Sequence, residues 1–332
     1  MASALEGELG LAGIEIEPAE AGHSNLTYFL RSGGRKLVLR RPPLPPYAAS
    51  AHDVLREYRI LAALRDTSVR VPQVVCSCAD PSVIGAPFYV MERIEGTIVS
   101  EVTPAPLDNP ADRARMGEGL IDGLLDLHEV RWKGTDLGSI GRPSGYLERQ
   151  LSLWSGQWAR YRTREIGAID EVGRALARDI PGSPQATVVH GDYKLDNVAF
   201  TPERPASLVA ILDWEMATIG DPLADLGFLT ATWLQGDDPD RLLGLSRATA
   251  EEGFPHRSDL IRRYEKRSES STERISWYQA LALWKLAILL EGSYRRFQAG
   301  TTDDPFFARL ERGVPALAVQ AGDALEGALA GP

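Results

Sequence analysis

Cysteine is scarce in this sequence. Only Cys76 and Cys78 occur among 332 residues, two apart in a strand-like run, so both side chains point to one face of that strand. A disulfide between them would be strained, and two thiols without a nearby partner make no zinc site. We therefore expect both to be reduced and to pack as small apolar residues.

Long apolar runs and an excess of basic charge are also missing. The most apolar stretch, residues 280–290, contains Lys285 and is shorter than the roughly 20 residues that span a bilayer. The first residues lack the basic start and apolar run of a signal peptide. With 36 Lys and Arg against 46 Asp and Glu, the net charge is −10, which disfavours binding to nucleic acid or anionic membranes. We expect a cytoplasmic protein with neither partner.

Several common catalytic motifs are absent. The phosphate loop G-x-x-x-x-G-K-[ST], the zinc-protease motif H-E-x-x-H and the hydrolase motif G-x-S-x-G do not occur. Residues 117–123 contain three glycines, but the third is one place late for a dinucleotide-binding loop and the segment has a helical pattern. Any chemistry must rest on other residues.

What is present falls into two parts. Residues 13–95 resemble a small sheet, with strands predicted at 13–17, 26–31, 36–40, 74–78 and 87–92. Gly33 and Gly34 suit a tight hairpin turn, the proline-rich residues 42–46 form a connection, and residues 51–65 place apolar side chains on one helical face.

A helical period dominates from about residue 110. Helices are predicted at 111–130, 146–161, 165–179, 221–235, 273–298 and 305–329, interrupted at 187–213 by two strand-like segments around a loop. We predict an α+β fold with two lobes, a sheet lobe at residues 1–95 and a helical lobe at 96–332, hinged at 93–97. A cleft between such lobes is a usual place for a small-molecule site.

The interruption contains the residues with the clearest chemistry. Asp192 precedes Asn197 by five residues, the spacing of the phosphotransfer loop H-R-D-x-x-x-x-N. Such a site needs a carboxylate that accepts the proton of the attacking hydroxyl and an amide oxygen that helps to hold a divalent cation. Asp213 ends the following apolar strand, where its carboxylate can hold Mg²⁺ together with Asn197.

These motifs resemble a known family. His190-Gly-Asp192 with Asn197, Asp213-Trp-Glu215 and Gly220-Asp-Pro-Leu-Ala-Asp225 are similar to the aminoglycoside phosphotransferase or choline-kinase-like family, which shares the protein-kinase fold. More narrowly, they resemble the kinase-like domain fused to some acyl-CoA dehydrogenases. The resemblance implies an enzyme that moves the γ-phosphoryl group of ATP, with GTP as an alternative donor, to a hydroxyl of a small molecule.

The same resemblance suggests nucleotide-binding residues in the sheet lobe. Arg40 ends Leu37-Val-Leu-Arg40 where the kinase pattern has lysine, a departure that keeps a cation able to bind phosphate. Glu57 falls inside the apolar arc of its helix, so we expect it to pair with Arg40; the alternative is a surface glutamate at the edge of that arc. Glu92, which ends the last strand before the hinge, is a further expected cofactor contact.

Two further sites carry open alternatives. Ser24 and Asn25 lie in the loop between the first two strands and could donate hydrogen bonds to phosphate, but this loop has one glycine and could equally be an ordinary turn. Lys194 resembles the catalytic-loop lysine of protein kinases, which could stabilise charge on the transferred group, and a solvated loop lysine is the alternative. Asp225 is expected to support the catalytic loop or its own helix start.

The acceptor and the activity also leave alternatives. Seven acids against two bases between Asp221 and His256 would suit a cationic acceptor such as an amino sugar or choline, or form a solvated helix face. The narrower resemblance implies a hydroxyacyl thioester instead. A regulator that binds nucleotide without turnover is the alternative class, supported by Arg40 and the single-glycine loop and opposed by the intact Asp192, Asn197 and Asp213.

Overall fold

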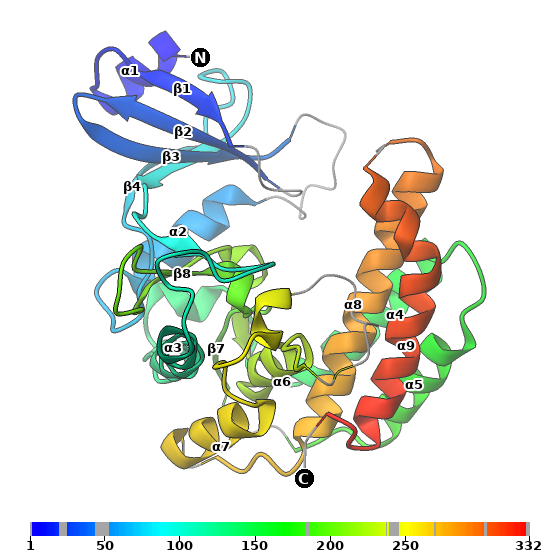
Figure 1. Cartoon of the computed structure of the whole chain (residues 1–332). Coiled ribbons are helices and arrows are strands. Elements are labelled where there is room, and N and C mark those ends of the chain that lie inside the picture. Colours follow the sequence, from blue (N-terminus) through cyan, green and yellow to red (C-terminus); the bar gives the residue numbers. More distant parts are fainter. Residues whose placement is uncertain are drawn as a thin grey trace.

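The computed structural model describes residues 2–19, 25–43, 53–182, 186–236, 238, 246–268, 270–301 and 304–329. Its N-terminal lobe is an antiparallel sheet of five strands in the order β1-β2-β3-β5-β4, with helix α2 beneath it (Figure 1). The bounds are β1 Glu15–Pro18, β2 Leu26–Ser32, β3 Arg35–Arg41, α2 Val54–Leu64, β4 Val74–Cys78 and β5 Phe88–Glu92. The predicted α+β two-lobe fold and its five-strand sheet are confirmed.

The two faces of this sheet belong to different cores. One face packs with helix α1 (Ala2–Leu9), which the sequence patterns did not predict, in a small cluster that includes Leu5, Leu30 and Phe88. On the other side, Ile60 and Leu61 of α2 join the large core that continues through the helical lobe. The sheet is thus tied to the second lobe through α2.

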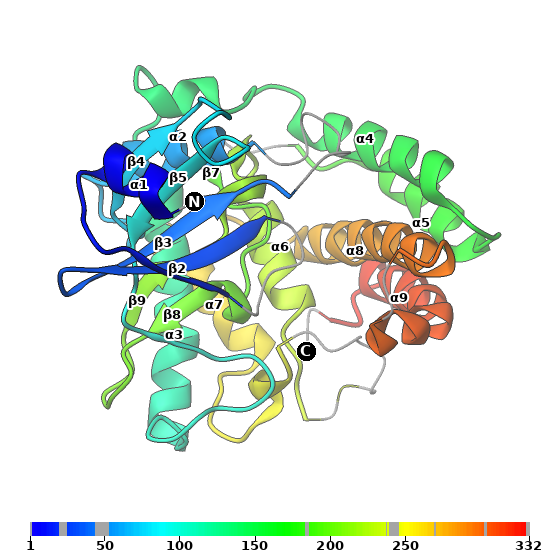
Figure 2. The same cartoon turned by 90° about the horizontal axis from the view of Figure 1, so that it is seen from above.

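The C-terminal lobe is built around one long helix. Helix α8 packs against α4, α5, α6 and α9, and Figure 2 shows this group extending well beyond the sheet. The bounds are α3 Pro110–His128, α4 Tyr146–Tyr161, α5 Gly167–Arg178, α6 Leu223–Ala231, α7 Arg257–Ser268, α8 Ile275–Gln298 and α9 Leu310–Leu325, with a 3-10 turn at Pro305–Arg309.

Short strands fill the predicted interruption. β7 (Thr187–Val189) pairs with β10 (Thr218–Gly220), and β8 (Val198–Phe200) lies between β6 (Thr97–Ile98) and β9 (Leu208–Ile211). The chain crosses to these strands at Gly96, where a Cβ would come within 2.9 Å of Val209 Cγ2 and 3.0 Å of the Phe200 carbonyl oxygen. Only glycine allows this close approach between the hinge and the β8-β9 pair.

Some sequence expectations differ from the structure. Helix α7 was missed because its sequence, RSDLIRRYEKRS, buries few apolar side chains. The helix predicted at 221–235 is limited to Leu223–Ala231, since Asp221 and Pro222 form its entry and the chain turns away after Thr232. Both cysteines are free thiols, and no helix of the described residues is long and apolar enough to cross a membrane.

Candidate active site

A strand pair brings the two predicted magnesium ligands together. β8 and β9 are antiparallel with Val198 opposite Ile211, so Asn197 and Asp213 lie at the same end of the pair. The Leu212 amide donates to the Asn197 carbonyl oxygen at 2.8 Å, which fixes the two chain segments side by side. Asp213 adopts φ +63°, a left-handed conformation that turns the chain sharply after the strand.

The catalytic loop is held from below by a buried carboxylate. Asp225 of α6, 1% exposed, accepts hydrogen bonds from the amides of His190 (2.6 Å) and Gly191 (2.8 Å). Burial opposes its ionisation, but the contact with His128, the nearby His190 and the hydrogen bond from the Gly191 amide keep the pKa of Asp225 below its ordinary value. Gly191 has φ +86° and would place a Cβ 2.8 Å from the Met216 carbonyl oxygen, so this position requires glycine.

The His190 ring also braces the loop. Its Nε2 atom is 2.8 Å from the Leu212 carbonyl oxygen, and its ring packs edge-on against Trp214 at 4.9 Å between centroids. The catalytic loop is therefore joined to the segment that carries Asp213 through both backbone and side chain.

Asp192 has two polar neighbours from its own loop. Asn197 Nδ2 donates to Asp192 Oδ2 at 2.8 Å and Lys194 Nζ lies 3.1 Å from the same oxygen. The Asp192 carboxylate remains about one quarter exposed, at 23%. It is fixed in position and partly exposed, although Asp192 is not among the residues that line the cavity between the lobes.

Across the cleft, an ion pair joins β3 and α2. Arg40 Nη1 lies 2.6 Å from Glu57 Oε1, and Arg40 Nη2 lies 3.4 Å from Asp213 Oδ1, with the Arg40 and Glu57 side chains 12% and 2% exposed. Burial raises the pKa of Glu57 to about 7, against the lowering effect of the Arg40 guanidinium. The Arg40–Glu57 contact expected from the sequence is present; its role toward a nucleotide stays a prediction.

Helix α2 is fastened to the other lobe by Arg56, a residue that the sequence patterns did not single out. Its guanidinium donates to three backbone carbonyl oxygens of the C-terminal lobe, those of Ile140 at 2.9 Å, Glu215 at 3.3 Å and Ala217. Backbone carbonyl acceptors leave no pattern in a sequence, so only the fold reveals this contact. It holds the neighbouring Glu57 toward Arg40.

Residues of both lobes line a cavity of about 420 Å³ at this place. Five of the predicted residues contribute to its wall: Asn25, Arg40, Glu57, Glu92 and Asp213. The wall also includes apolar side chains, which could enclose a flat ring; these are Val38, Leu61, Tyr89, Met91 and Ile98. Ser24 lies outside the described residues.

Two of the residues predicted to contact the nucleotide, Asn25 and Glu92, already contact other side chains of the protein. Asn25 Nδ2 lies 3.4 Å from Glu215 Oε2, which links the N-terminal sheet to the segment after Asp213. Glu92 accepts from Arg35 at 2.5 Å and is 41% exposed, so part of its charge is already matched at the rim.

The donor set near the loop fits a magnesium ion. Asn197 uses its amide nitrogen to donate to Asp192, which leaves its side-chain oxygen available, and Asp213 supplies a partly exposed carboxylate. Magnesium prefers such hard oxygen ligands and completes its shell with water and substrate phosphates. No group of three or more His, Cys, Asp or Glu that could hold a metal alone occurs in the described part of the chain.

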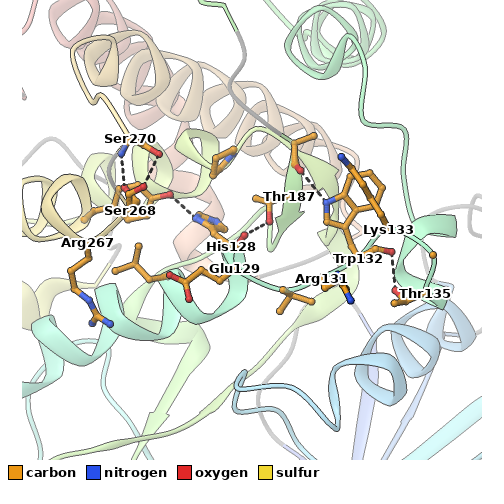
Figure 3. Close-up of a pocket in the computed structure, with 16 residues that line it drawn as sticks. His128, Glu129, Arg131, Trp132, Lys133, Thr135, Thr187, Arg267, Ser268 and Ser270 are labelled. Atoms are coloured by element: carbon orange, nitrogen blue, oxygen red, sulfur yellow. Dashed lines mark hydrogen bonds between the residues drawn. The ribbon is translucent and has the colours of Figure 1, made fainter.

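A larger cavity, of about 950 Å³, lies away from the cleft between α3, α7 and the start of β7 (Figure 3). None of its lining residues belongs to the N-terminal lobe or to the catalytic loop. The cavity is connected to the catalytic loop through His128, one of its lining residues. His128 Nδ1 lies 2.8 Å from the Tyr264 hydroxyl, and His128 Nε2 lies 3.4 Å from Asp225 Oδ2. This cavity therefore borders the support of the catalytic loop, not the reacting groups.

The acidic segment after Asp221 is largely occupied by internal contacts. Asp221 accepts from the Tyr278 hydroxyl at 2.7 Å, Asp238 pairs with Arg257 at 2.5 Å, and Glu251 pairs with Arg113 at 2.9 Å. Asp237 and Asp240 lie outside the described residues. These three described carboxylates therefore serve contacts within the fold.

A sheet lobe over a helical lobe, with this loop and ion pair facing each other across the cleft, defines a protein-kinase-like phosphotransferase. Residues 15–260 match the phosphotransferase enzyme family APH, and the chain belongs to this family. The family resemblance inferred from the motifs is confirmed.

The chain is similar to one region of several longer proteins. It is 33% identical over 289 residues to acyl-CoA dehydrogenase family member 10 of Mus musculus, covering 86% of this chain and 27% of the relative. It is 31% identical over 302 residues to acyl-CoA dehydrogenase family member 11 of Homo sapiens, covering 89% of this chain and 38% of the relative. The chain therefore spans well under half the length of these two relatives.

Solved structures share the whole architecture. A crystal structure described as a putative aminoglycoside phosphotransferase from Ralstonia eutropha JMP134 superimposes with a TM-score of 0.82 at 29% identity, covering 98% of each chain. Aminoglycoside 2'-phosphotransferase-IIIa, solved as a GDP complex, has a TM-score of 0.64 at 15% identity, covering 97% of each chain, and shows the common fold alone.

Proposed function

We propose that this protein transfers the γ-phosphoryl group of ATP to a hydroxyl of a small molecule. The observation that carries the proposal is that Asn197, bonded to Asp192, lies at the same end of the β8-β9 pair as Asp213, which Arg40 contacts from the other lobe. Positioning and charge neutralisation provide most of the rate enhancement in this reaction class, so a rigid set of such groups is what it needs.

Each residue has a proposed task. Asp192 accepts the proton of the acceptor hydroxyl as that oxygen bonds to the γ-phosphorus and the bond to the ADP oxygen breaks. Lys194 stabilises negative charge on the transferred group, and Arg40, kept in place by Glu57, binds the α- and β-phosphates. Magnesium, held by Asn197 and Asp213, would neutralise charge on the β- and γ-phosphates.

Asn25 and Glu92 are proposed contacts to the nucleotide at the two ends of the cleft. The donor in this proposal is ATP, with GTP as the alternative. The apolar side chains of the cavity wall could pack against the adenine or the guanine ring. Comparing the two nucleotides in a thermal-shift titration distinguishes them.

For the acceptor, a hydroxyacyl thioester is favoured over an amino sugar or choline-like amine. Two observations support this choice: the relatives are acyl-CoA dehydrogenase family members, and Asp221, Asp238 and Glu251, three of the acids that suggested a cationic acceptor, are engaged in contacts within the fold.

The test is phosphoryl transfer with the variant Asp192→Ala. We expect turnover to fall by about 10² to 10⁴ because the general base is lost, while ATP still binds. Rates are measured by ADP release over amino sugars, choline-like amines and hydroxyacyl thioesters, and ATP binding by magnesium-dependent thermal shift. An unchanged steady-state rate removes Asp192 from the mechanism. Stabilisation by ATP without turnover on any acceptor would favour the alternative, a nucleotide-binding regulator.

A further inference from the structure

The cavity of about 950 Å³ that has His128 in its wall, which we call the α3–α7 cavity, touches three elements that support the catalytic loop. His128 ends α3, and Thr187 begins β7, which runs directly into His190. Pro222 lies just before α6, the helix that carries Asp225. A molecule held in this cavity therefore lies against the supports of the loop and outside the cleft.

Hydrogen bonds connect the wall of this cavity to the catalytic loop. His128 Nε2 lies 3.4 Å from Asp225 Oδ2, and the same oxygen accepts from the His190 amide at 2.6 Å. The Thr187 hydroxyl donates to the His128 carbonyl oxygen at 2.5 Å, so the start of β7 is joined to the end of α3 as well. Coupling between sites is carried by contiguous contacts of this kind, and His128 is two contacts away from the loop backbone.

The wall carries an excess of positive charge, although the chain has a net charge of −10. Arg131, Lys133 and Arg267 line it. Among the described residues of the wall, Glu129 supplies the one carboxylate, and Arg267 is already paired with Asp122 at 2.5 Å. Arg131 and Lys133 form no ion pair with a carboxylate in the ranges that the structure describes. Two cations without a partner beside an open cavity favour an anionic ligand.

The helix ends in the wall do not cancel this charge. Carbonyl oxygens at a helix C-terminus carry partial negative charge and repel an anion where they are free. At the end of α3 they are occupied: the Glu129 amide donates to the Leu125 carbonyl oxygen at 3.0 Å, and Thr187 occupies that of His128. At the end of α7, Arg267 lies in the last turn and offsets the partial charge there.

The rest of the wall offers a hydroxyl donor and an aromatic surface. Ser268 and Trp132 lie on either side of His128 (Figure 3). Ser268 Oγ accepts from the Ser270 amide at 3.3 Å, which leaves its own proton for an oxyanion. The Trp132 ring is held in place because its indole nitrogen donates to the Ala186 carbonyl oxygen at 3.0 Å. Cations and a hydroxyl for a charged end, with an apolar ring for the remainder, match a phosphate monoester.

We propose that the α3–α7 cavity binds a phosphate monoester as an effector, and that its binding stabilises the catalytic loop through His128. Arg131 and Lys133 bind the phosphate, and the Trp132 ring packs against the organic part. The bound molecule restrains the end of α3, so His128 keeps its contact with Asp225. This site lies apart from the cleft and is independent of the acceptor that the cleft takes.

The first test compares four small probes: phenyl phosphate, benzoate, benzyl alcohol and benzylamine. Binding is measured by calorimetry with saturating MgADP present, which requires no turnover. We expect phenyl phosphate to bind at least tenfold more tightly than benzyl alcohol, and benzylamine to bind most weakly. Equal affinities for benzylamine and phenyl phosphate would overturn an anion site, and equal affinities for benzoate and phenyl phosphate would overturn the assignment to a phosphate.

Variants locate the bound probe. Arg131→Gln and Lys133→Gln should each weaken the binding of phenyl phosphate about tenfold, because each removes a charged donor. Arg174→Gln, at an exposed position of α5, is the matched control and should change nothing. If both cavity variants bind phenyl phosphate like the parent protein, the α3–α7 cavity is not the site.

Hydrogen exchange of the His190 and Gly191 amides, which Asp225 accepts, tests the link to the loop. Phenyl phosphate should slow this exchange at least threefold in the parent protein. The effect should be lost in His128→Phe and kept in His128→Gln, whose side-chain amide can still donate to Asp225. An unchanged exchange rate in the parent protein, or slowing that persists in His128→Phe, would overturn the link.

The exchange measurement separates this proposal from the proposed function, because it needs no ATP turnover. Slowed exchange in a protein that transfers no phosphoryl group would leave the effector site standing and refute the kinase activity. Phosphoryl transfer without any exchange response to phenyl phosphate would do the opposite.

Discussion

Lys285 is a charged side chain in a buried position, where its positive charge does not stabilise the fold. Its ammonium is enclosed by α4 and α8 and has an aromatic ring as its near neighbour. A buried ammonium of this kind lowers stability relative to an apolar side chain. The opposite arrangement occurs at Glu57, a buried carboxylate that meets Arg40 at 2.6 Å.

The position of Lys285 has a measurable effect on stability. Because its pKa is lowered from 10.5 to about 8 on folding, the unfolded chain binds more protons between these values. The stability lost by burying the charged ammonium is therefore fully retained above pH 10.5. It is lost as the pH falls through 8, because the folded protein must then hold the ammonium in its charged form. We expect Lys285→Met to raise the free energy of unfolding at pH 7 by roughly 2 to 3 kcal/mol, and to give no gain above pH 10.5.

Urea unfolding of both proteins at pH 7, 9 and 10.5 checks this expectation, with the parent protein as the reference at each pH. A gain that is equal at all three values would show that Lys285→Met acts through packing and not through the ammonium.

Helix α2 acts as an element that sets the spacing between the lobes. Arg56 ties it to three carbonyl oxygens of the other lobe, while Glu57, the next residue, holds Arg40. We expect Arg56→Ala to weaken ATP binding about tenfold and to lower the free energy of unfolding by about 1 to 3 kcal/mol, since buried carbonyl groups lose their donor.

Arg59→Ala is the matched control, because Arg59 lies on the same helix, is 62% exposed and lies 3.8 Å from the Asp53 carboxylate. Calorimetric titration with MgATP compares the two variants. Equal affinities would mean that the anchor of α2 does not contribute to the nucleotide site.

The end of α3 supports the catalytic loop through a second contact. His128 meets Asp225, which in turn holds the His190 and Gly191 amides. We expect His128→Phe to lower turnover about tenfold, because small displacements of a reacting group are costly, while the affinity for ATP stays unchanged. Tyr264→Phe removes only the outer partner of His128 and should have a smaller effect. Steady-state rates and ATP titrations distinguish loss of positioning from loss of binding.

Elements with a strong apolar period were predictable, and polar ones were not. The spacing of Val54, Leu61 and their neighbours was enough to find α2, and the hairpin glycines located β2 and β3. Helix α7 carries five basic residues among twelve, so no apolar stripe marked it. Its position is fixed by Leu260, Ile261 and Tyr264, which pack into a core made by other elements.

At the scale of the molecule, the lobes share one core. The inner side chains of α2 belong to the same cluster as α3, α6 and α8, and only the outer face of the sheet has a cluster of its own. A shared core couples the unfolding of its parts, because exposing one side removes the packing of the other.

The chain carries natural probes of both lobes. All seven tryptophans lie at residue 132 or later, whereas both cysteines lie in β4. In a Cys76→Ser variant, we expect the reactivity of the buried Cys78 thiol and the tryptophan fluorescence to change at the same urea concentration. Thiol exposure at distinctly lower urea would show that the sheet lobe unfolds by itself.

The sequence by itself determined the local order of the site. Asp192 and Asn197 lie five residues apart in one loop, and Asp213 ends the next long apolar strand, so short-range spacing was sufficient to identify them and the family. Their catalytic roles stay predictions, because position alone does not demonstrate chemistry.

Only the tertiary structure decided which distant residues meet. Arg40 and Asp213 are 173 positions apart, Arg56 reaches Ala217 over 161, and Arg295 reaches Arg160 over 135. No local pattern encodes such pairs, since they depend on how helices and strands pack after they form. The apolar period of a helix says which face is buried, whereas the neighbour across that face is chosen by the fit of the whole core.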